Sequence, residues 1–307
     1  MMPWLLISVF GPPLAGVVLA VLWWLIRRRA MRSLVGVVAV VTLLAGLLGV
    51  LAEVLIRFAG SMSLLIPIHP TVEFVIWYFD NRYIIPLVVG ILGVVLLAFP
   101  IRSRRGAGVA ELAPRGAFRF TRPRWLIPPA AVAALILLIT LLAGAASQPA
   151  ATTGRYDMYV VEISGENTMA TAIYGWFYSL PALLAIALLA ATAAGSLVLI
   201  ARPPLSLDHD QDARTRTLRS RNVVTVATGA LLIHLGLIMQ SLAGTASLAA
   251  SMSSDLGRIT LATPVAAMVP VFIGASYVAA ALGVAMWGTV ALTAVGVRHP
   301  TRVIVGS

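Results

Sequence analysis

The chain has 307 residues, of which 60% are hydrophobic and 11% charged, and its formal net charge is +11. This composition lies outside the range of soluble globular domains and indicates a chain that lies in a lipid bilayer. Cysteine and lysine are both absent from the sequence. Their absence excludes disulfides, thiolate metal sites, a retinal Schiff base and a Walker A loop within the chain.

Seven apolar runs are long enough to cross, as helices, a hydrocarbon core about 30 Å thick. They cover residues 3–26, 33–56, 83–101, 125–145, 173–200, 223–244 and 265–296. Backbone groups in lipid must pair within their own segment, and the runs do not alternate as barrel strands do. We therefore predict an all-α integral membrane protein whose residues 1–307 form a single polytopic domain.

Arginine is concentrated in the predicted loops on one side of these runs. That side holds 18 of the 22 arginines, and the other side holds Arg57, Arg82, Arg155 and Arg258. The basic side of a membrane protein faces the cytoplasm, which predicts an outer N-terminus and a cytoplasmic C-terminus. Topology and anionic lipid explain the positive charge, so we expect no nucleic-acid partner. Arginine without lysine, together with abundant Ala, Val, Leu and Gly, is typical of proteins from high-GC bacterial genomes. We therefore expect a bacterial plasma membrane.

Near the outer end of the second run, Glu53 and Arg57 stand four residues apart. This spacing predicts an ion pair on one helix face. Ionisable groups at membrane depth are costly unless they are paired, so such a pair is either structural or functional.

Aromatic residues open the third and fifth runs, in "WYFDNRY" and "YGWFYSLP". One interpretation is a belt of rings at the boundary between lipid and water. The alternative is an outer vestibule that could hold a ligand, lined by Trp77, Asp80, Arg82, Tyr174, Trp176 and Tyr178.

Prolines follow these openings, and a third lies at a similar depth in the last run: Pro86, Pro181 and Pro270. Their spacing suggests one helix followed by three tandem helical hairpins. A small outer cap is expected, because residues 156–161 alternate as a strand does. The segment 71–79 is either a partner strand or an interfacial helix.

Small residues recur every four positions in two of the runs, which lets helices approach closely in lipid. They are Ala187, Ala191 and Gly195 in the fifth run, and Ala275, Ala279 and Gly283 in the seventh. Both helices are therefore predicted to lie inside the bundle or against a partner.

In the sixth run, His234 shares a helical face with Ala227, Ala230 and Ser241. This face predicts contact with protein. His234 would then form a hydrogen bond between helices, or alternatively relay protons or contact a substrate.

Signatures of enzymes and cofactors are weak. The acids of "LDHDQD", residues 207–212, have no metal-ligand spacing and are expected to form a solvated turn. We expect no cofactor and no catalytic residue.

The favoured function is a transport-associated subunit or permease without its own ATPase, served by a partner membrane subunit or a separately encoded ATPase. The alternative is sensing or complex assembly through the outer loops, and a membrane enzyme is a remote third.

Overall fold

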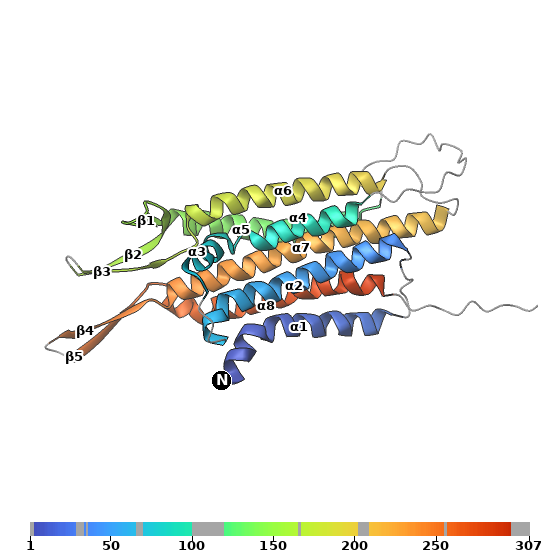
Figure 1. Ribbon diagram of the computed structural model, residues 1–307. Helices are drawn as coiled ribbons and strands as arrows, with labels where there is room; N and C mark the ends of the chain where they lie inside the picture. Colours follow the sequence, from blue (N-terminus) through green and yellow to red (C-terminus); the bar gives the residue numbers. More distant parts are fainter. Residues whose placement is uncertain are drawn as a thin grey trace, which may run out of the picture.

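Long helices run side by side in this computed structural model (Figure 1). It describes residues 3–28, 34, 36–65, 70–99, 120–164, 167–201, 209–254 and 257–295. The helices are α1 (Pro3–Arg27), α2 (Val37–Leu65), α3 (Val72–Asn81), α4 (Ile85–Ala98), α5 (Ile127–Ala145), α6 (Trp176–Ala201), α7 (His209–Ala246) and α8 (Val269–Ala294), with short 3₁₀ turns η1 (Pro123–Trp125) and η2 (Ala266–Met268). Six helices are long and apolar enough to cross a membrane, and a seventh span results if α3 and α4 count as one. The predicted helical bundle is therefore confirmed for these residues.

The two ends of the bundle differ in kind (Figure 1). One end, called here the hairpin end, carries α3 and the strands β1 (Gln148–Pro149), β2 (Tyr156–Ser164), β3 (Asn167–Ala172), β4 (Ala249–Ser254) and β5 (Gly257–Ala262). The opposite end, called here the arginine end, holds the end of α1 at Arg27 and the first turns of α7, with Arg214, Arg216 and Arg219. Successive spans run in opposite directions between these ends.

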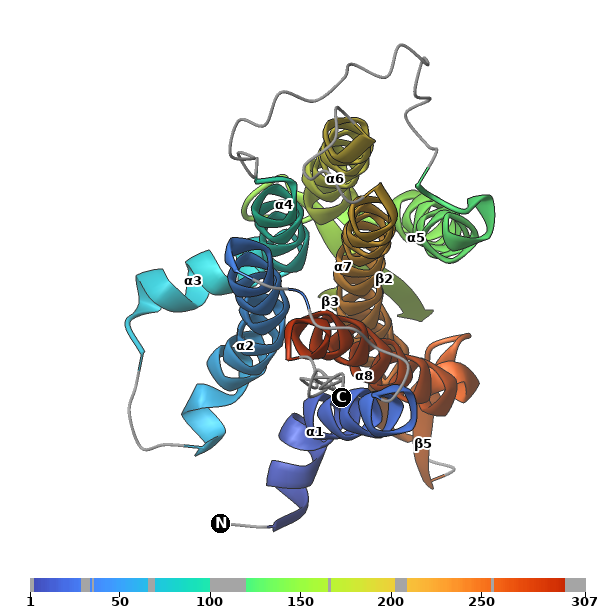
Figure 2. The same ribbon diagram turned by 90° about the vertical axis from the view of Figure 1, so that its right-hand side faces the viewer.

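α7 is the central helix (Figure 2). In the most apolar 18-residue stretch of α7, 94% is buried, whereas the corresponding stretches of the other five candidate spans are 17–33% buried. Glycines allow its neighbours to come close: a Cβ on Gly283 of α8 would lie 2.9 Å from the carbonyl oxygen of Gly229. The Trp287 indole covers Gly229 and Gly49 of α2, and it donates to the carbonyl of Val226 at 2.8 Å.

The two predicted small-residue faces have different outcomes. In α8, Ala279 and Gly283 are buried against α7, so that prediction is confirmed. In α6, Ala187, Ala191 and Gly195 are exposed, and burial inside the bundle was wrong for this face. The residues of α6 that pack inward include Ala182, Ala185 and Leu189.

α7 begins well before the predicted position of 223, because its charged first turns find partners. Arg216 Nε donates to Asp212 at 2.7 Å, and its Nη1 bonds to the carbonyl of Ile200 at the end of α6. Arg219 Nη2 donates to the carbonyls of Leu97 and Phe99, at 2.9 and 3.1 Å, and so caps α4. The solvated acidic turn was therefore wrong for Asp212, which is buried in an ion pair.

The predicted third span, 83–101, is wrong in its extent. α4 covers only Ile85–Ala98, and it is bent by 68° from α3. Pro86 explains the break, since it lacks the N–H that would bond to the carbonyl of Arg82 in a continuous helix. The segment 71–79 thus lies in a helix, with Thr71 as its N-cap.

Two antiparallel hairpins extend from the hairpin end (Figure 1). β2 confirms the predicted strand, and it pairs with β3 so that Met158 faces Ala172. β4 and β5 pair with Ala249 opposite Ala262. The sequence did not reveal β4, because "AASMSS" lacks the aromatic and β-branched residues that are typical of strands.

The element order supports tandem hairpins. A β-hairpin joins α5 to α6 and another joins α7 to α8, whereas α3 takes this place between α2 and α4. A six-residue segment recurs at or just before the ends of α2, α5 and α7: "FAGSMS" (58–63), "LAGAAS" (142–147) and "LAGTAS" (242–247). In the last two, the final serine donates to the carbonyl of the glycine, at 2.7 and 2.8 Å. Superposition of three whole units remains a prediction.

The contact between Gly49 and Trp287 gives a test of the packing. A Cβ on Gly49 would lie 0.4 Å from a ring carbon of Trp287. We expect Gly49→Ala to lower the free energy of unfolding by about 1–3 kcal/mol, the cost of overpacking a filled core. Gly195→Ala is the control, because a Cβ there meets no atom within 4 Å. Thermal unfolding of the purified protein in detergent measures both, and equal melting temperatures would contradict this packing.

Candidate functional site: a cavity at the hairpin end

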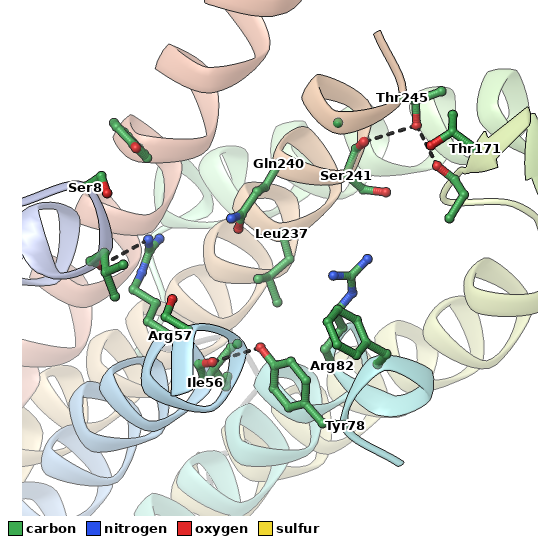
Figure 3. A pocket seen from close by; sticks show the side chains of 17 residues that line it. Ser8, Ile56, Arg57, Tyr78, Arg82, Thr171, Leu237, Gln240, Ser241 and Thr245 are labelled. Carbon is green, nitrogen blue, oxygen red and sulfur yellow. Dashed lines mark hydrogen bonds between the residues drawn. The ribbon is translucent and has the colours of Figure 1, made fainter. Parts of the chain in front are cut away.

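A cavity of about 470 Å³ lies among helices at the hairpin end (Figure 3). Segments distant in sequence line it: α1, α2, the end of α3, the break before α4, β3, α7 and α8. Its lining includes two arginines, Arg57 and Arg82, and polar side chains from α7. A volume of this size is typical of small-molecule sites.

Arg57 forms the ion pair that the sequence predicted. Its Nε donates to Glu53 Oε1 at 2.6 Å, and both side chains are almost entirely buried. Its Nη1 also donates to the carbonyl of Val9 in α1, at 3.4 Å. This carbonyl is available because Pro13, four residues later, has no N–H to offer it. Arg57 therefore links the proline-interrupted α1 to α2 at the wall of the cavity.

Arg82 lies in the break between α3 and α4 and reaches toward the cavity (Figure 3). Its Nη2 donates to the Tyr83 hydroxyl at 2.6 Å, and its guanidinium lies over the rings of Phe79 and Tyr83. Its Nε is buried and has no hydrogen-bond partner in the part of the chain that the structure describes. No carboxylate forms an ion pair with Arg82 among those same residues.

α3 is held against α2 beside the cavity. The Tyr78 hydroxyl donates to the carbonyl of Ile56 at 2.8 Å, across two helices. Gly60 makes this approach possible, since a Cβ there would lie 2.8 Å from the Tyr78 oxygen. The break that carries Arg82 is thus fixed in position from the α3 side.

The α7 side of the cavity supplies neutral polar groups. Thr245 donates to the carbonyls of Ala172 and Ser241, at 2.9 and 3.1 Å, so its hydroxyl is satisfied. The Gln240 amide extends from α7 toward the cavity (Figure 3) and makes no hydrogen bond within the described ranges. It is available to a ligand as both donor and acceptor.

The charges of the cavity do not cancel. Glu53 neutralises Arg57, whereas the charge of Arg82 has no counter-ion among the described side chains. A buried guanidinium is stabilised by a bidentate anion such as a carboxylate or a phosphate. Within the described residues, no three histidine, aspartate or glutamate side chains converge as they would at a metal site. The arrangement therefore suits an anion.

Of the six residues expected to line a vestibule, only Arg82 lines the cavity. Trp77 points outward and is 55% exposed, while Asp80 forms a surface ion pair with Arg155 at 3.1 Å. Trp176 covers Gly144 of α5. Tyr174 and Tyr178 pack edge to face against Tyr83.

Sequence reasoning missed Gln240 and Tyr277, and it named Ser241 only on the packing face of His234 and not as part of a cavity. Each belongs to a long apolar helix, and no local pattern separates its position from the lipid-facing or buried positions around it.

His234 lies outside the cavity lining, fully buried behind the tyrosines. Its Nδ1 lies 2.8 Å from the carbonyl oxygen of Tyr83, an acceptor, so Nδ1 carries the proton and donates. Its Nε2 lies 3.4 Å from the Tyr174 hydroxyl. Burial raises the pKa of the Tyr174 phenol above its ordinary value, which keeps this group an O–H donor to Nε2. Both ring nitrogens therefore have partners, as the structural interpretation of His234 requires.

The hydrogen bonds of His234 can be tested by a double-mutant cycle. His234→Leu leaves the Tyr83 carbonyl and the Tyr174 hydroxyl unpaired, so we expect the free energy of unfolding to fall by about 1 kcal/mol. Tyr174→Phe removes the second partner. If the two side chains are bonded, the double variant loses less than the two single losses combined. Strict additivity in chemical or thermal unfolding would contradict the bond.

The known proteins offer no guide to this cavity. Comparisons with protein-family models, curated proteins and solved structures found no match to the chain. Its function must therefore be inferred from the residues of the site.

Proposed function

We propose that the protein is a transport-associated subunit or permease of a bacterial plasma membrane that takes an anionic ligand into the cavity from the outer side. The observation that carries this proposal is Arg82, a cation without a counter-ion among the described residues, placed where a helical span is broken. Transporters commonly build substrate sites where a helix is broken, because irregular backbone is tolerated where it lines a cavity.

The orientation rests on the arginines of the sequence. The hairpin end corresponds to the side that holds only 4 of the 22 arginines, and it is therefore placed outside. The cavity extends inward to Leu237, nine residues before the end of α7, which is about 13 Å along a helix. Deeper in the bundle, Trp287 fills the space between α2 and α7. This arrangement fits a site open to the outside and closed toward the cytoplasm.

The chain contains no lysine and hence no Walker A loop. Energy for uptake would come from an ion gradient or from a separately encoded ATPase, and a partner membrane subunit remains part of the proposal.

Sensing or complex assembly is the second candidate. Its support is the cap at the hairpin end, where two β-hairpins extend beyond the helices (Figure 1). The ion pair between Asp80 and Arg155 ties α3 to the segment before β2. A partner bound to the cap could therefore act on the broken span.

Arg82→Gln tests the proposed site. Detergent-purified protein is heated with a panel of monoanions, from acetate and dimethyl phosphate to short-chain phosphodiester lipids. We expect at least one to stabilise the wild type, by about 2–3 kcal/mol at a hundredfold excess over Kd. Arg82→Gln should lose this effect, because the unpaired cation is gone.

Arg124→Gln is the matched control, since Arg124 is exposed at the arginine end, outside the cavity lining. A wild type indifferent to every anion, or an Arg82→Gln protein that responds fully, would refute the site. Uptake of the stabilising anion into proteoliposomes then separates transport from sensing.

Threading is tested by single cysteines in a chain that has none of its own. Thr152→Cys lies in an exposed turn between β1 and β2, and Gln211→Cys is exposed in the first turn of α7. In intact cells we expect an impermeant thiol reagent to label the first variant only. Labelling of Gln211→Cys alone would reverse the orientation.

A further inference from the structure

The cavity has a polar wall and an apolar wall. Arg82, Gln240 and Ser241 contribute guanidinium, amide and hydroxyl groups. The apolar wall consists of side chains from five elements: Val9, Ile56, Phe79, Leu237 and Tyr277. A site for a small hydrated anion would not need so much apolar surface, whereas an amphiphile would use both walls.

The apolar wall reaches the side of the bundle that faces lipid. Phe79 is 43% exposed and Tyr277 is 39% exposed, although both line the cavity. Pro12 and Pro13 interrupt α1, and the turns before them splay away from the rest of the bundle (Figures 1 and 2). α1 packs mainly along α8 and only sparsely against α2. These features favour access to the cavity from the side.

α3 places the cavity at the depth of lipid headgroups. This helix lies across the bundle axis after its 68° bend, and Val72, Ile76 and Trp77 are exposed on it. A short helix with exposed apolar side chains and a tryptophan is typical of the boundary between lipid and water. Arg82 directly follows α3, so its guanidinium meets a ligand at this level.

Two copies of the recurring six-residue segment line the cavity. Gly60 and Ser61 come from the first copy, Gly244 and Thr245 come from the third, and all four line the cavity. In the second copy, alanine replaces the hydroxyl residue at position 145, and Trp176 covers Gly144. Two copies thus meet at the cavity: the Tyr78 hydroxyl covers Gly60 in one, and Gly244 is open in the other, while Trp176 fills the third.

We propose that the cavity binds the monoanionic headgroup of an amphiphilic lipid, of the phosphodiester class, which enters sideways from the outer leaflet. The inference rests on the proposed function and names its ligand. The single uncompensated cation, Arg82, matches one negative charge rather than the two of a phosphomonoester. The lipid's phosphate oxygens accept hydrogen bonds from Arg82 and Gln240, its glycerol hydroxyl or ester groups meet Ser61 and Ser241, and its first methylenes lie along Ile56 and Tyr277.

The test compares three probes on purified protein in a neutral maltoside detergent. They are dioctanoyl phosphatidylglycerol, a monoanionic phosphodiester; dioctanoyl phosphatidylcholine, which has the same chains but is zwitterionic; and dimethyl phosphate, the anion without chains. Melting temperature gives apparent affinity, and native mass spectrometry counts the bound lipid. We expect the phosphatidylglycerol to bind at least about tenfold more tightly than the other two, and Arg82→Gln to weaken it about tenfold, because the cation is lost. Arg124→Gln should leave it unchanged.

A second variant tests the space rather than the charge. A Cβ on Gly244 meets no atom within 4 Å, and Gly244 lines the cavity, so we expect the ring of Gly244→Phe to occupy it. It should abolish lipid binding while keeping the melting temperature of the free protein. Gly274→Phe is the control, because that glycine is equally open but lies outside the cavity lining.

The outcomes separate this inference from the proposed function. Equal binding of dimethyl phosphate and phosphatidylglycerol, both lost in Arg82→Gln, would overturn the lipid but keep the anion site. Equal binding of both lipids to the wild type and to Arg82→Gln would overturn the headgroup assignment. No response to any anion would overturn both proposals.

Discussion

A charge inside an apolar bundle must find a partner there, and this requirement orders much of the structure. Arg216 pairs with Asp212, Arg219 caps the end of α4, and Arg57 pairs with Glu53. The same arginines also bond to the carbonyls of Ile200, Leu97 and Val9, which fixes α6 and α4 relative to α7, and α1 relative to α2. Breaking such a pair costs more than forming it gains, because the remaining charge is left desolvated. Arg82 is the exception among these arginines, since its partners are aromatic rings and one hydroxyl.

Prolines act on the same bundle through the carbonyls that they leave free. In α1, Pro13 releases the carbonyl of Val9, and Arg57 takes it up from another helix. Between α3 and α4, Pro86 interrupts the helical hydrogen bonds, and the chain bends by 68° from α3 into α4. Both interruptions occur at the hairpin end, beside the cavity. These two interruptions of the helical backbone therefore lie beside Arg82, which has no counter-ion among the described residues.

Local patterns predicted what depends on neighbours in sequence. Apolar length identified the spans, and the spacing of four residues identified the pair of Glu53 and Arg57. Patterns failed where the partner is distant. The charged turns of α7 resemble a loop until Ile200 and Leu97 are known to lie beside them, and small residues on α6 look like a packing face although they are exposed. The cavity needed five helices, the break before α4 and a strand to assemble, so only its two arginines stood out in the sequence.

The fit of Trp287 between two glycines also bears on motion. Its ring covers Gly49 of α2 and Gly229 of α7, and its own helix is α8. The indole holds these three helices in register, because sliding or rotating one helix against the others would push its backbone into the ring. The three helices therefore move as one rigid body. A rearrangement of the bundle would thus leave α2, α7 and α8 as a fixed frame and move the peripheral helices α5 and α6 around it.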